Sequence, residues 1–343
     1  MEIFNPEIIK LTQYLFYTGK GGVGKTSIAC ATAISLSVPM RAYNITGIEN
    51  VRALLKKDKF TVSSDMINNC ALPHLDDVIK DLYQSNKKVI FTMGKGGVGK
   101  TTLAATIALG LAAMGKKVHL TTTDPAAHLS YILHERDGIT MSHIDEEEEL
   151  RKYKNEILTK ARLTGASEAD IAYIDEDLRS PCTQEIAVFR AFAEVVDRAD
   201  NQVVVIDTAP TGHTLLLLDS TQSYSREVER SSGDVPDSIR RLLPRLRDES
   251  ETAVIIVTLP EATPYYEAKR LEEDLNRAHI KTKWWVINSS LYRTDSSNRL
   301  IRAKASNEIH WINIIDQHTK GHCALIAWSA DEIKGSKLLD LIA

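Results

Sequence analysis

The stretch GKGGVGKT, residues 94–101, decides the fold of this chain. It follows the apolar run Val89–Phe91 and leads into a helical pattern over Thr101–Met114. A strand, a glycine-rich turn and a helix start, in this order, form the setting that a phosphate-binding P-loop requires. The glycines let successive N–H groups point at phosphate oxygens, and the helix adds the positive end of its dipole. A glycine-rich turn without a ligand is the alternative, but the complete pattern favours a bound nucleotide.

Two side chains of this stretch contribute chemistry of their own. Lys100 is expected to reach the β- and γ-phosphates, and the Thr101 hydroxyl is expected to hold Mg²⁺. A nucleotide and Mg²⁺ are therefore the expected ligands. The residues that we expect to bind the nucleotide from this segment are Gly94, Lys95, Gly96, Gly97, Val98, Gly99, Lys100, Thr101 and Thr102.

Apolar runs on either side of helical stretches predict the fold class. Short, nearly continuous apolar runs are typical of parallel strands that are buried on both faces. Their alternation with helices predicts an α/β fold with a doubly wound, mostly parallel sheet. The expected strands are Val89–Phe91, Val118–Leu120, Val203–Ile206, Ala253–Val257, Trp284–Ile287 and Ala324–Trp328. The expected helices are Asp76–Tyr83, Thr101–Met114, Glu185–Val196, Thr263–Ala278 and a closing helix from Asp331 onward.

Composition and charge narrow the function classes. The chain has 343 residues with 42 basic and 46 acidic side chains, a net charge of −4 that does not suggest nucleic acid as a partner. We expect neither a signal peptide nor a membrane-spanning segment, because no basic start leads into a long apolar run. The four cysteines are scattered and form no CxxC pair, which favours a reducing cytoplasm over a structural zinc site.

The P-loop sequence occurs twice. GKGGVGKT also spans residues 19–26, and the likeness continues into the following helical pattern until Leu36. Too few residues separate the two copies to build the several strand–helix units that a nucleotide-binding sheet needs. The first copy is therefore predicted to be a fragment.

Two acidic residues follow predicted strands, at the sheet edge where α/β folds gather their ligand groups. Asp207 follows Val203–Ile206 and is expected to hold Mg²⁺ or its water. Asp124 follows the strand that ends near Thr122, and we expect it to orient or deprotonate the attacking water. A helix N-cap is the alternative for both, and it is stronger for Asp124 because a proline follows.

Two charged stretches favour exposed helices. Glu146–Glu149 and the basic residues after them predict a solvated helix face with pairs four residues apart. The four arginines within residues 240–247 surround leucines, which predicts either a lid or subunit-contact helix or a plain surface helix.

Two longer motifs resemble those of a known family. Asp207 begins DTAPTGHT, residues 207–214, and Asp124 lies within TTTDPAAH, residues 121–128. Both motifs resemble switch segments of the arsenical pump-driving ATPases and of their relatives that target tail-anchored membrane proteins. The P-loop resembles the deviant form of that class, which carries an extra lysine after its first glycine, here Lys95. The resemblance covers residues 87–343.

The resemblance implies roles for further residues. Lys95 would reach across a nucleotide-sandwich interface to a partner's phosphates, which implies a nucleotide-dependent homodimer. Asn288, after the strand Trp284–Ile287, would contact the adenine of ATP. The residues implied as catalytic are Asp124, Lys100 and Lys95, and those implied as Mg²⁺ ligands are Thr101 and Asp207.

The chain also departs from the family's pattern. Members of the pump type carry two complete nucleotide-binding halves, whereas the first half here keeps its P-loop and lacks its switches, its Mg²⁺ aspartate and its cysteines. The sequence resembles a pump ATPase with most of the first half missing. We expect a remnant of that half over residues 1–57, a linker over 58–86 and a P-loop ATPase domain over 87–343.

A third motif concerns metalloids. RSPCT, residues 179–183, resembles the metalloid-site segment in the second half of the bacterial arsenical pump ATPase. Ser180 as N-cap and Pro181 as first helical residue would place Cys182 in the first turn, where the helix dipole lowers the pKa of a thiol. The resemblance implies Cys182, Ser180 and His213 as ligands of trivalent arsenic or antimony. The alternative is that Cys182 is an unreactive buried cysteine that binds no metalloid.

Together these features imply an ATPase that energises efflux of arsenite or antimonite through a membrane carrier, with As(III) or Sb(III) as an effector. The implied partners are the carrier, an arsenite metallochaperone and a second copy of the chain. The implied location is the cytoplasm, at the inner face of the membrane through the carrier.

Two alternatives stay open. A targeting ATPase for tail-anchored proteins needs an apolar groove, commonly rich in methionine, and no methionine lies between the second switch and the next strand. The other alternative is a degenerate remnant that binds nucleotide without transport coupling.

Overall fold

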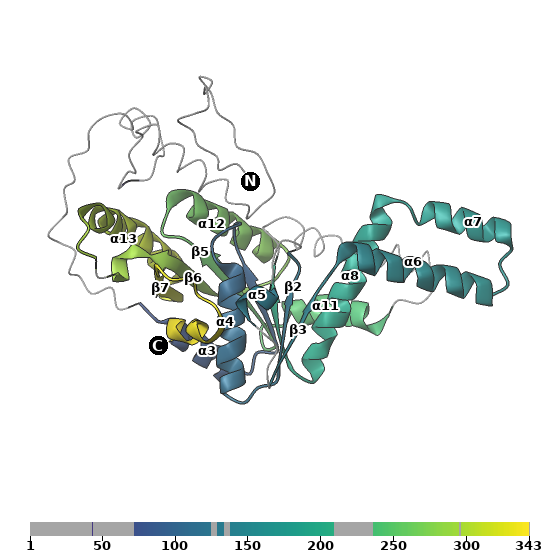
Figure 1. Cartoon of the computed structure of the whole chain (residues 1–343), viewed down its shortest axis with the longest axis horizontal. Helices are drawn as coiled ribbons and strands as arrows, with labels where there is room; N and C mark the ends of the chain where they lie inside the picture. Colours follow the sequence, from purple (N-terminus) through teal and green to yellow (C-terminus); the bar gives the residue numbers. More distant parts are fainter. Residues whose placement is uncertain are drawn as a thin grey trace, which may run out of the picture.

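The computed structural model describes residues 43, 72–124, 129–133, 138–208, 236–294 and 296–342. Within these ranges, seven strands form one sheet in which all paired neighbours run parallel (Figure 1). The strand order is β3-β2-β4-β1-β5-β6-β7, so the strand before the P-loop is central. The strands are β1 (Val89–Met93), β2 (Val118–Thr122), β3 (Ile139–His143), β4 (Val203–Asp207), β5 (Thr252–Thr258), β6 (Thr282–Ser290) and β7 (Cys323–Ala327).

Alternate residues of each central strand enter opposite layers of the core. In β1, Ile90 joins one apolar cluster, while Val89 and Phe91 join the other. Every residue of β1, β2, β4 and β5 is buried. A sheet with two buried faces needs helices on both, as parallel sheets generally do.

The helices supply these two layers. On one face lie α3 (Leu75–Gln84), α4 (Lys100–Ala113) and the short α5 (Leu129–Ile132). On the other lie α8 (Pro181–Asp197), α11 (Asp237–Arg247), α12 (Ala262–Arg277) and α13 (Arg299–Thr319). Helix α3 buries its apolar face so closely on α4 that a Cβ at Gly110 would lie 2.9 Å from Ile79 Cδ1.

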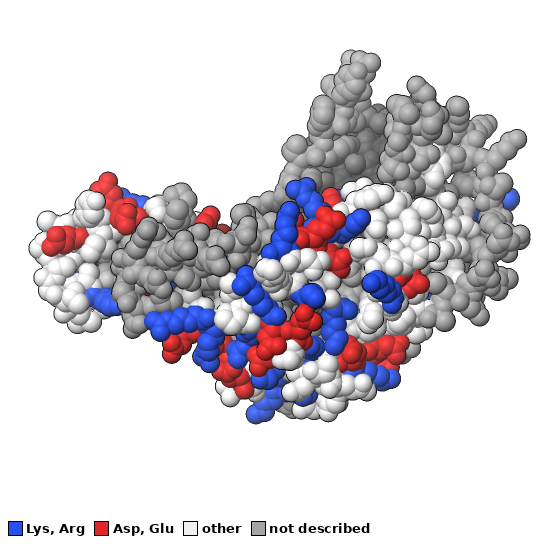
Figure 2. Space-filling view, turned by 180° about the vertical axis from the view of Figure 1, so that it is seen from behind, with Lys and Arg blue, Asp and Glu red and all other residues white. Residues whose placement is uncertain are grey.

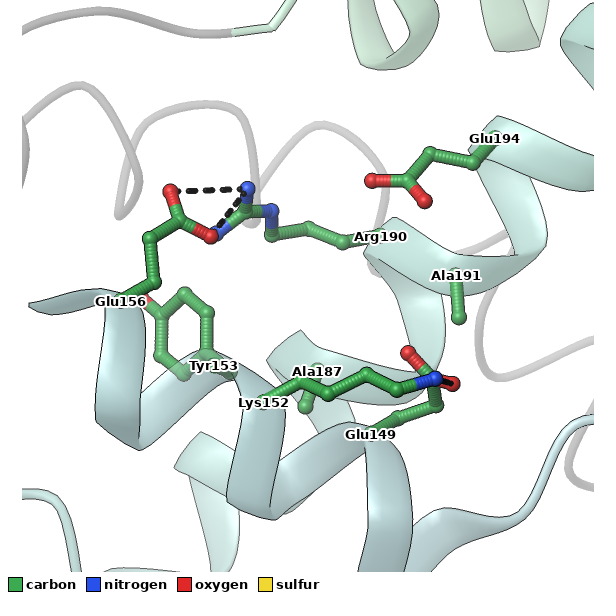
Figure 3. Close-up of a pocket in the computed structure, with 8 residues that line it drawn as sticks. All are labelled: Glu149, Lys152, Tyr153, Glu156, Ala187, Arg190, Ala191 and Glu194. Atoms are coloured by element: carbon green, nitrogen blue, oxygen red, sulfur yellow. Dashed lines mark hydrogen bonds and ion pairs between the residues drawn. The ribbon is translucent and has the colours of Figure 1, made fainter.

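Helices α6 (Glu146–Leu163) and α7 (Glu168–Asp177) form an arm that extends from the sheet beside α8 (Figure 1). Between α6 and α8, the Arg190 guanidinium lies 5.1 Å from the centre of the Tyr153 ring and donates to Glu156, along a pocket of about 190 Å³ (Figure 3). The predicted solvated face of α6 is confirmed, because Lys152 pairs with Glu148 at 3.1 Å.

Helix α11 is packed on α8. Its apolar residues Ile239, Leu242 and Leu246 are buried, while Arg241 pairs with Asp197 of α8 at 2.8 Å. This arrangement favours the surface-helix interpretation of the arginine-rich stretch. Basic and acidic side chains are interspersed in the same way over the face of the molecule in Figure 2.

The six predicted strands and the predicted helices around residues 76–83, 101–114, 185–196 and 263–278 are confirmed. The expected closing helix is wrong. The chain forms a 3₁₀ helix there, Gly335–Leu341, and Gly335 has a left-handed φ of 60° that starts it as a separate turn. Strand β3 and helix α13 were not predicted. The first P-loop and the helix pattern over residues 47–57 lie outside the described residues.

Candidate functional site

The P-loop turn between β1 and α4 depends on two glycines. Gly94 has φ 154° and Gly99, the N-cap of α4, has φ 93°. A Cβ at Gly94 would lie 2.3 Å from the carbonyl oxygen of Val257, and one at Gly99 would lie 2.2 Å from Asn288 Nδ2. At Gly94 both the backbone conformation and the backbone carbonyl exclude a side chain, whereas at Gly99 the left-handed backbone conformation favours glycine and the nearby atom belongs to a side chain.

The two lysines of the loop lie in different surroundings. Lys100 is buried, with 6% of the residue exposed, and its Nζ donates to the carbonyl oxygen of Lys95 at 3.1 Å. Burial lowers the pKa of Lys100, while Asp207 and Asp124 oppose that shift. The Lys95 side chain instead extends to α12, where its Nζ lies 3.2 Å from Glu267 Oε1.

Asp207, at the end of β4, lies against the start of α4. Its Oδ2 accepts hydrogen bonds from Thr101 Oγ1 at 2.7 Å and from Thr122 Oγ1 at 3.2 Å. Its Oδ1 is buried and has no hydrogen-bond partner among the residues that the structure describes. Burial raises the pKa of this carboxyl to about 6, while Thr101, Lys100 and Thr122 oppose the shift.

This donor set fits Mg²⁺. A buried carboxylate oxygen that lacks a partner, next to a threonine hydroxyl at a helix start, offers the oxygen ligands that Mg²⁺ prefers. Thr101 and Asp207 would hold the ion, as the sequence predicts.

Asp124 lies beside the same carboxyl group. Its N–H donates to Thr122 Oγ1 at 3.1 Å, and the N–H of Thr123 donates to the carbonyl oxygen of Asp207 at 2.9 Å. The Asp124 charge contributes to the pKa shifts of Lys100 and Asp207. The structure therefore brings Asp124, Lys100, Thr101 and Asp207 together.

Asn288, near the end of β6, contacts the P-loop directly. Its Nδ2 donates to the carbonyl oxygen of Val98 at 2.9 Å. Strands β4, β1, β5 and β6 are neighbours, so Asp207, the P-loop, Val257 and Asn288 share the carboxyl edge of the sheet. Ligand groups of open α/β sheets gather at this edge.

The metalloid residues are described only in part. Helix α8 begins at Pro181 with Ser180 as N-cap, so Cys182 stands in its first turn as expected. Ser180 Oγ lies 3.2 Å from Thr183 Oγ1. His213 and most of the second switch lie outside the described residues. Among the residues that are described, no group of three or more histidine, cysteine, aspartate or glutamate side chains has metal-binding geometry.

Sequence reasoning missed two residues at the site. Thr122 is the second hydroxyl donor to Asp207, and Glu267 is the ion-pair partner of Lys95. The position of Thr122, two residues before Asp124 in the TTTD run, was the available signal for the first. Nothing in the sequence around Glu267 indicates its contact with the P-loop.

Comparison with known proteins assigns the family. The family model for anion-transporting ATPases matches residues 12–45, 87–234 and 231–343. This chain belongs to that family. Along this chain, the match to the family model stops after residue 45 and resumes at residue 87.

Several members of the family are similar over most of this chain. This chain is 41% identical to the arsenical pump-driving ATPase of Escherichia coli over 309 residues. The aligned region covers 89% of this chain and 52% of that protein. The arsenical pump-driving ATPase of Acidiphilium multivorum is 40% identical over 310 residues, 89% of this chain and 53% of that protein. ATPase GET3A of Arabidopsis thaliana is 27% identical over 257 residues, 65% of this chain and 73% of that protein. The chain thus spans about half the length of the pump-driving relatives that it matches. No helix among the described residues is long and apolar enough to cross a bilayer.

Proposed function

We propose that this chain is a Mg²⁺-dependent ATP hydrolase that works at the P-loop of residues 94–101. The observation that carries the proposal is the contact between Thr101 and Asp207, 2.7 Å from Oγ1 to Oδ2, beside the unpartnered Asp207 Oδ1. A P-loop turn alone would fit any phosphate group. A buried carboxylate at the helix start adds the group that a Mg·nucleotide needs.

Phosphoryl transfer depends on the positions and charges of the groups around the phosphates more than on covalent chemistry. Each side chain of the site described above then has a role in it. The N–H groups of the loop and the Lys100 ammonium bind the phosphates, and Thr101 and Asp207 would hold the Mg²⁺ ion. Mg²⁺, when bound, neutralises charge on the β- and γ-phosphates. Asp124 orients the attacking water and accepts its proton. Asn288 contacts the adenine from the edge of the loop.

ATP hydrolysis by this chain is also proposed to be coupled to transport. We infer that hydrolysis energises efflux of arsenite or antimonite through a membrane carrier, with the chain at the inner face of the membrane. Two observations support it: the relatives that are named arsenical pump-driving ATPases, and the RSPCT segment at the start of α8. A second copy of the chain would complete the nucleotide sandwich, and an arsenite metallochaperone would deliver the metalloid. Residues 1–57 would be the remnant of a first half.

The two P-loops give the sharpest test of the catalytic assignment. Only the second is followed by Asp124 and Asp207, so Lys100→Ala should abolish hydrolysis and Lys25→Ala should change it little. Nucleotide at about 100 times its dissociation constant should stabilise the wild type by about 2.7 kcal/mol. Steady-state assays measure the loss of hydrolysis, and thermal unfolding with and without Mg·ATP measures the stabilisation. A Mg·ATP shift that survives Lys100→Ala and disappears in Lys25→Ala would reverse the assignment.

Antimonite tests the coupling. Soft trivalent metalloids favour several thiolates, and Cys182 is the one thiol of the chain in a position that matches the family's site. We therefore expect weak activation of hydrolysis by antimonite, and no activation in Cys182→Ser. Hydrolysis is measured against antimonite concentration for both proteins, with Cys323→Ser as control because Cys323 is buried in β7. Strong activation that persists in Cys182→Ser would place the metalloid elsewhere.

A further inference from the structure

Glu308 is a buried carboxylate that the site described above does not use. It lies on α13, and 4% of the residue is exposed. Its Oε2 accepts three hydrogen bonds: from Ser290 Oγ at 2.8 Å, from Leu291 N at 2.8 Å and from Tyr292 N at 3.1 Å. Burial raises the pKa of this carboxyl, although the same hydrogen bonds oppose the shift. All three donors belong to one short segment, residues 290–292, at and just beyond the end of β6.

The segment that Glu308 binds follows closely on Asn288. Ser289 has φ 54°, in the left-handed region that residues other than glycine rarely adopt. At the same place, the pairing of β6 with β7 shifts register between Ile287 and Ser290. The strand is therefore irregular directly after Asn288, and its pairing with β7 resumes at Ser290, opposite Ala327. Three hydrogen bonds to the Glu308 carboxylate stabilise this irregular segment, in addition to the pairing of Ser290 with β7.

Asn288 carries this constraint to the P-loop. Its side-chain amide donates to Val98, and its Nδ2 fills the space that a Cβ of Gly99 would need. A displacement of residue 288 by about an ångström would therefore break the hydrogen bond or press on the N-cap of α4. A continuous path of contacts leads from Glu308 through residues 289–292 and Asn288 to the P-loop.

We propose that Glu308 is a positioning residue for the nucleotide site. It fixes the turn over residues 289–292 and thereby holds Asn288 against Val98 and Gly99. The proposal rests on the proposed function, because the element that it positions is the P-loop of residues 94–101. A carboxylate that only stabilised the fold would leave the nucleotide affinity unchanged, and this difference is measurable.

Glu272 provides a matched control, because it accepts hydrogen bonds from the same strand, β6. This carboxylate, on α12, accepts from Thr282 Oγ1 at 2.6 Å and from Trp285 Nε1 at 2.9 Å, near the start of β6 and away from Asn288. Glu308→Gln and Glu272→Gln should both lower the unfolding temperature. Glu308→Gln alone should weaken binding of Mg·ADP, measured by calorimetry, by about tenfold, which corresponds to about 1.4 kcal/mol. Glu272→Gln should leave the dissociation constant within about twofold.

A double variant tests the path. If Glu308 acts through Asn288, then Glu308→Gln combined with Asn288→Ala should bind Mg·ADP no more weakly than Asn288→Ala alone. Additive losses would overturn the proposal, as would an unchanged dissociation constant in Glu308→Gln. Ser290→Ala, which removes one of the three hydrogen bonds to the carboxylate, takes the place of Glu308→Gln if that variant fails to fold.

Hydrogen exchange separates this proposal from the proposed function. Amide exchange of residues 94–101 in the nucleotide-free protein should be faster in Glu308→Gln than in the wild type, and unchanged in Glu272→Gln. Equal exchange in all three proteins would refute the positioning role. A wild type that bound no nucleotide would refute the proposed function, and the exchange comparison would still decide whether Glu308 holds the P-loop.

Discussion

Asp207 combines two properties that oppose each other. Its side chain is fully buried, which raises the pKa of the carboxyl from 3.8 to about 6, yet the group would have to be ionised to hold Mg²⁺ as proposed. Hydrogen bonds from Thr101 and Thr122 and the charge of Lys100 offset part of the cost of burial. The residue thus lowers folding stability in order to place a negative charge at the site.

We expect Asp207→Asn to stabilise the ligand-free protein at neutral pH. The pKa is higher in the folded than in the unfolded state, so this group's contribution to stability is fully present below about pH 4 and is lost as the pH rises to about 6. Above that window the ionised carboxyl costs at most about 3 kcal/mol. Denaturant unfolding at about pH 4 and pH 7.5 measures the difference, and the gain should be larger at pH 7.5.

The same variant should lose the stabilisation that Mg·ATP gives the wild type, because its neutral amide is a poorer ligand for the ion. Asp175→Asn is the control: Asp175 is a partly exposed partner of Arg179 on the arm, so its effect should be small and not depend on nucleotide. An Asp207→Asn protein that is less stable than the wild type at pH 7.5 would show that the hydrogen bonds of the carboxylate outweigh its burial.

Helix α11 is held to the sheet and to α8 by one arginine in particular. The Arg245 side chain is 11% exposed, lies 2.9 Å from Glu251 Oε2, contacts Asp200 and donates to the carbonyl oxygen of Val196 at 3.3 Å. Arg245→Ala should lower the free energy of unfolding by about 2–3 kcal/mol, because it removes hydrogen bonds to charged groups that a largely buried guanidinium makes. Arg241, which is 50% exposed, also pairs with Asp197 and Asp200, and Arg241→Ala should cost less than about 1 kcal/mol. Equal losses in denaturant unfolding would contradict this ranking.

The sequence predicts the strands and helices that contain apolar runs. It does not predict β3 and α13, which polar contacts help to hold in place. In β3, Ile139 is the one fully buried residue. The strand is joined to β2 by His119, whose Nδ1 lies 2.8 Å from Thr140 Oγ1 and whose Nε2 lies 2.9 Å from Ser142 Oγ. These contacts are between residues far apart in the sequence, so no local pattern shows them. In α13, the buried Glu308 interrupts the apolar face that would have revealed the helix.

The same distinction applies to the site. The P-loop, Thr101 and Asp207 follow from a motif and from the rule that parallel strands end at one edge. Glu267 and Glu308 act across tertiary contacts with residues more than 15 positions away, so their sequence neighbours carry no signal. The roles of Cys182 and His213 stay predictions.

The order of the strands explains why the site is assembled from distant segments. Strand β1 lies between β4 and β5, and β6 follows β5, which brings Asp207 and Asn288 to opposite sides of one loop. In the single chain, the Lys95 side chain forms an ion pair with Glu267 of α12, outside the loop. Its pair with Glu267 leaves the two side chains 38% and 43% exposed, and a pair this exposed contributes about 0–1 kcal/mol. A phosphate from a nucleotide on a second chain is a stronger partner for Lys95 than this carboxylate.

We therefore expect hydrolysis to require a pair of chains. Two copies related by a twofold axis would each place Lys95 at the other's phosphates, so specific activity should rise with protein concentration. Lys95→Ala should abolish hydrolysis and keep the stabilisation by Mg·ATP, since Lys100 and Asp207 remain. Glu267→Gln, which releases Lys95, should lower the concentration at which activity is half-maximal. Activity over a dilution series and mass in solution with Mg·ATP measure these effects. A monomer mass in Mg·ATP together with constant specific activity would mean that Lys95 acts within its own chain, and the pairing would have to be abandoned.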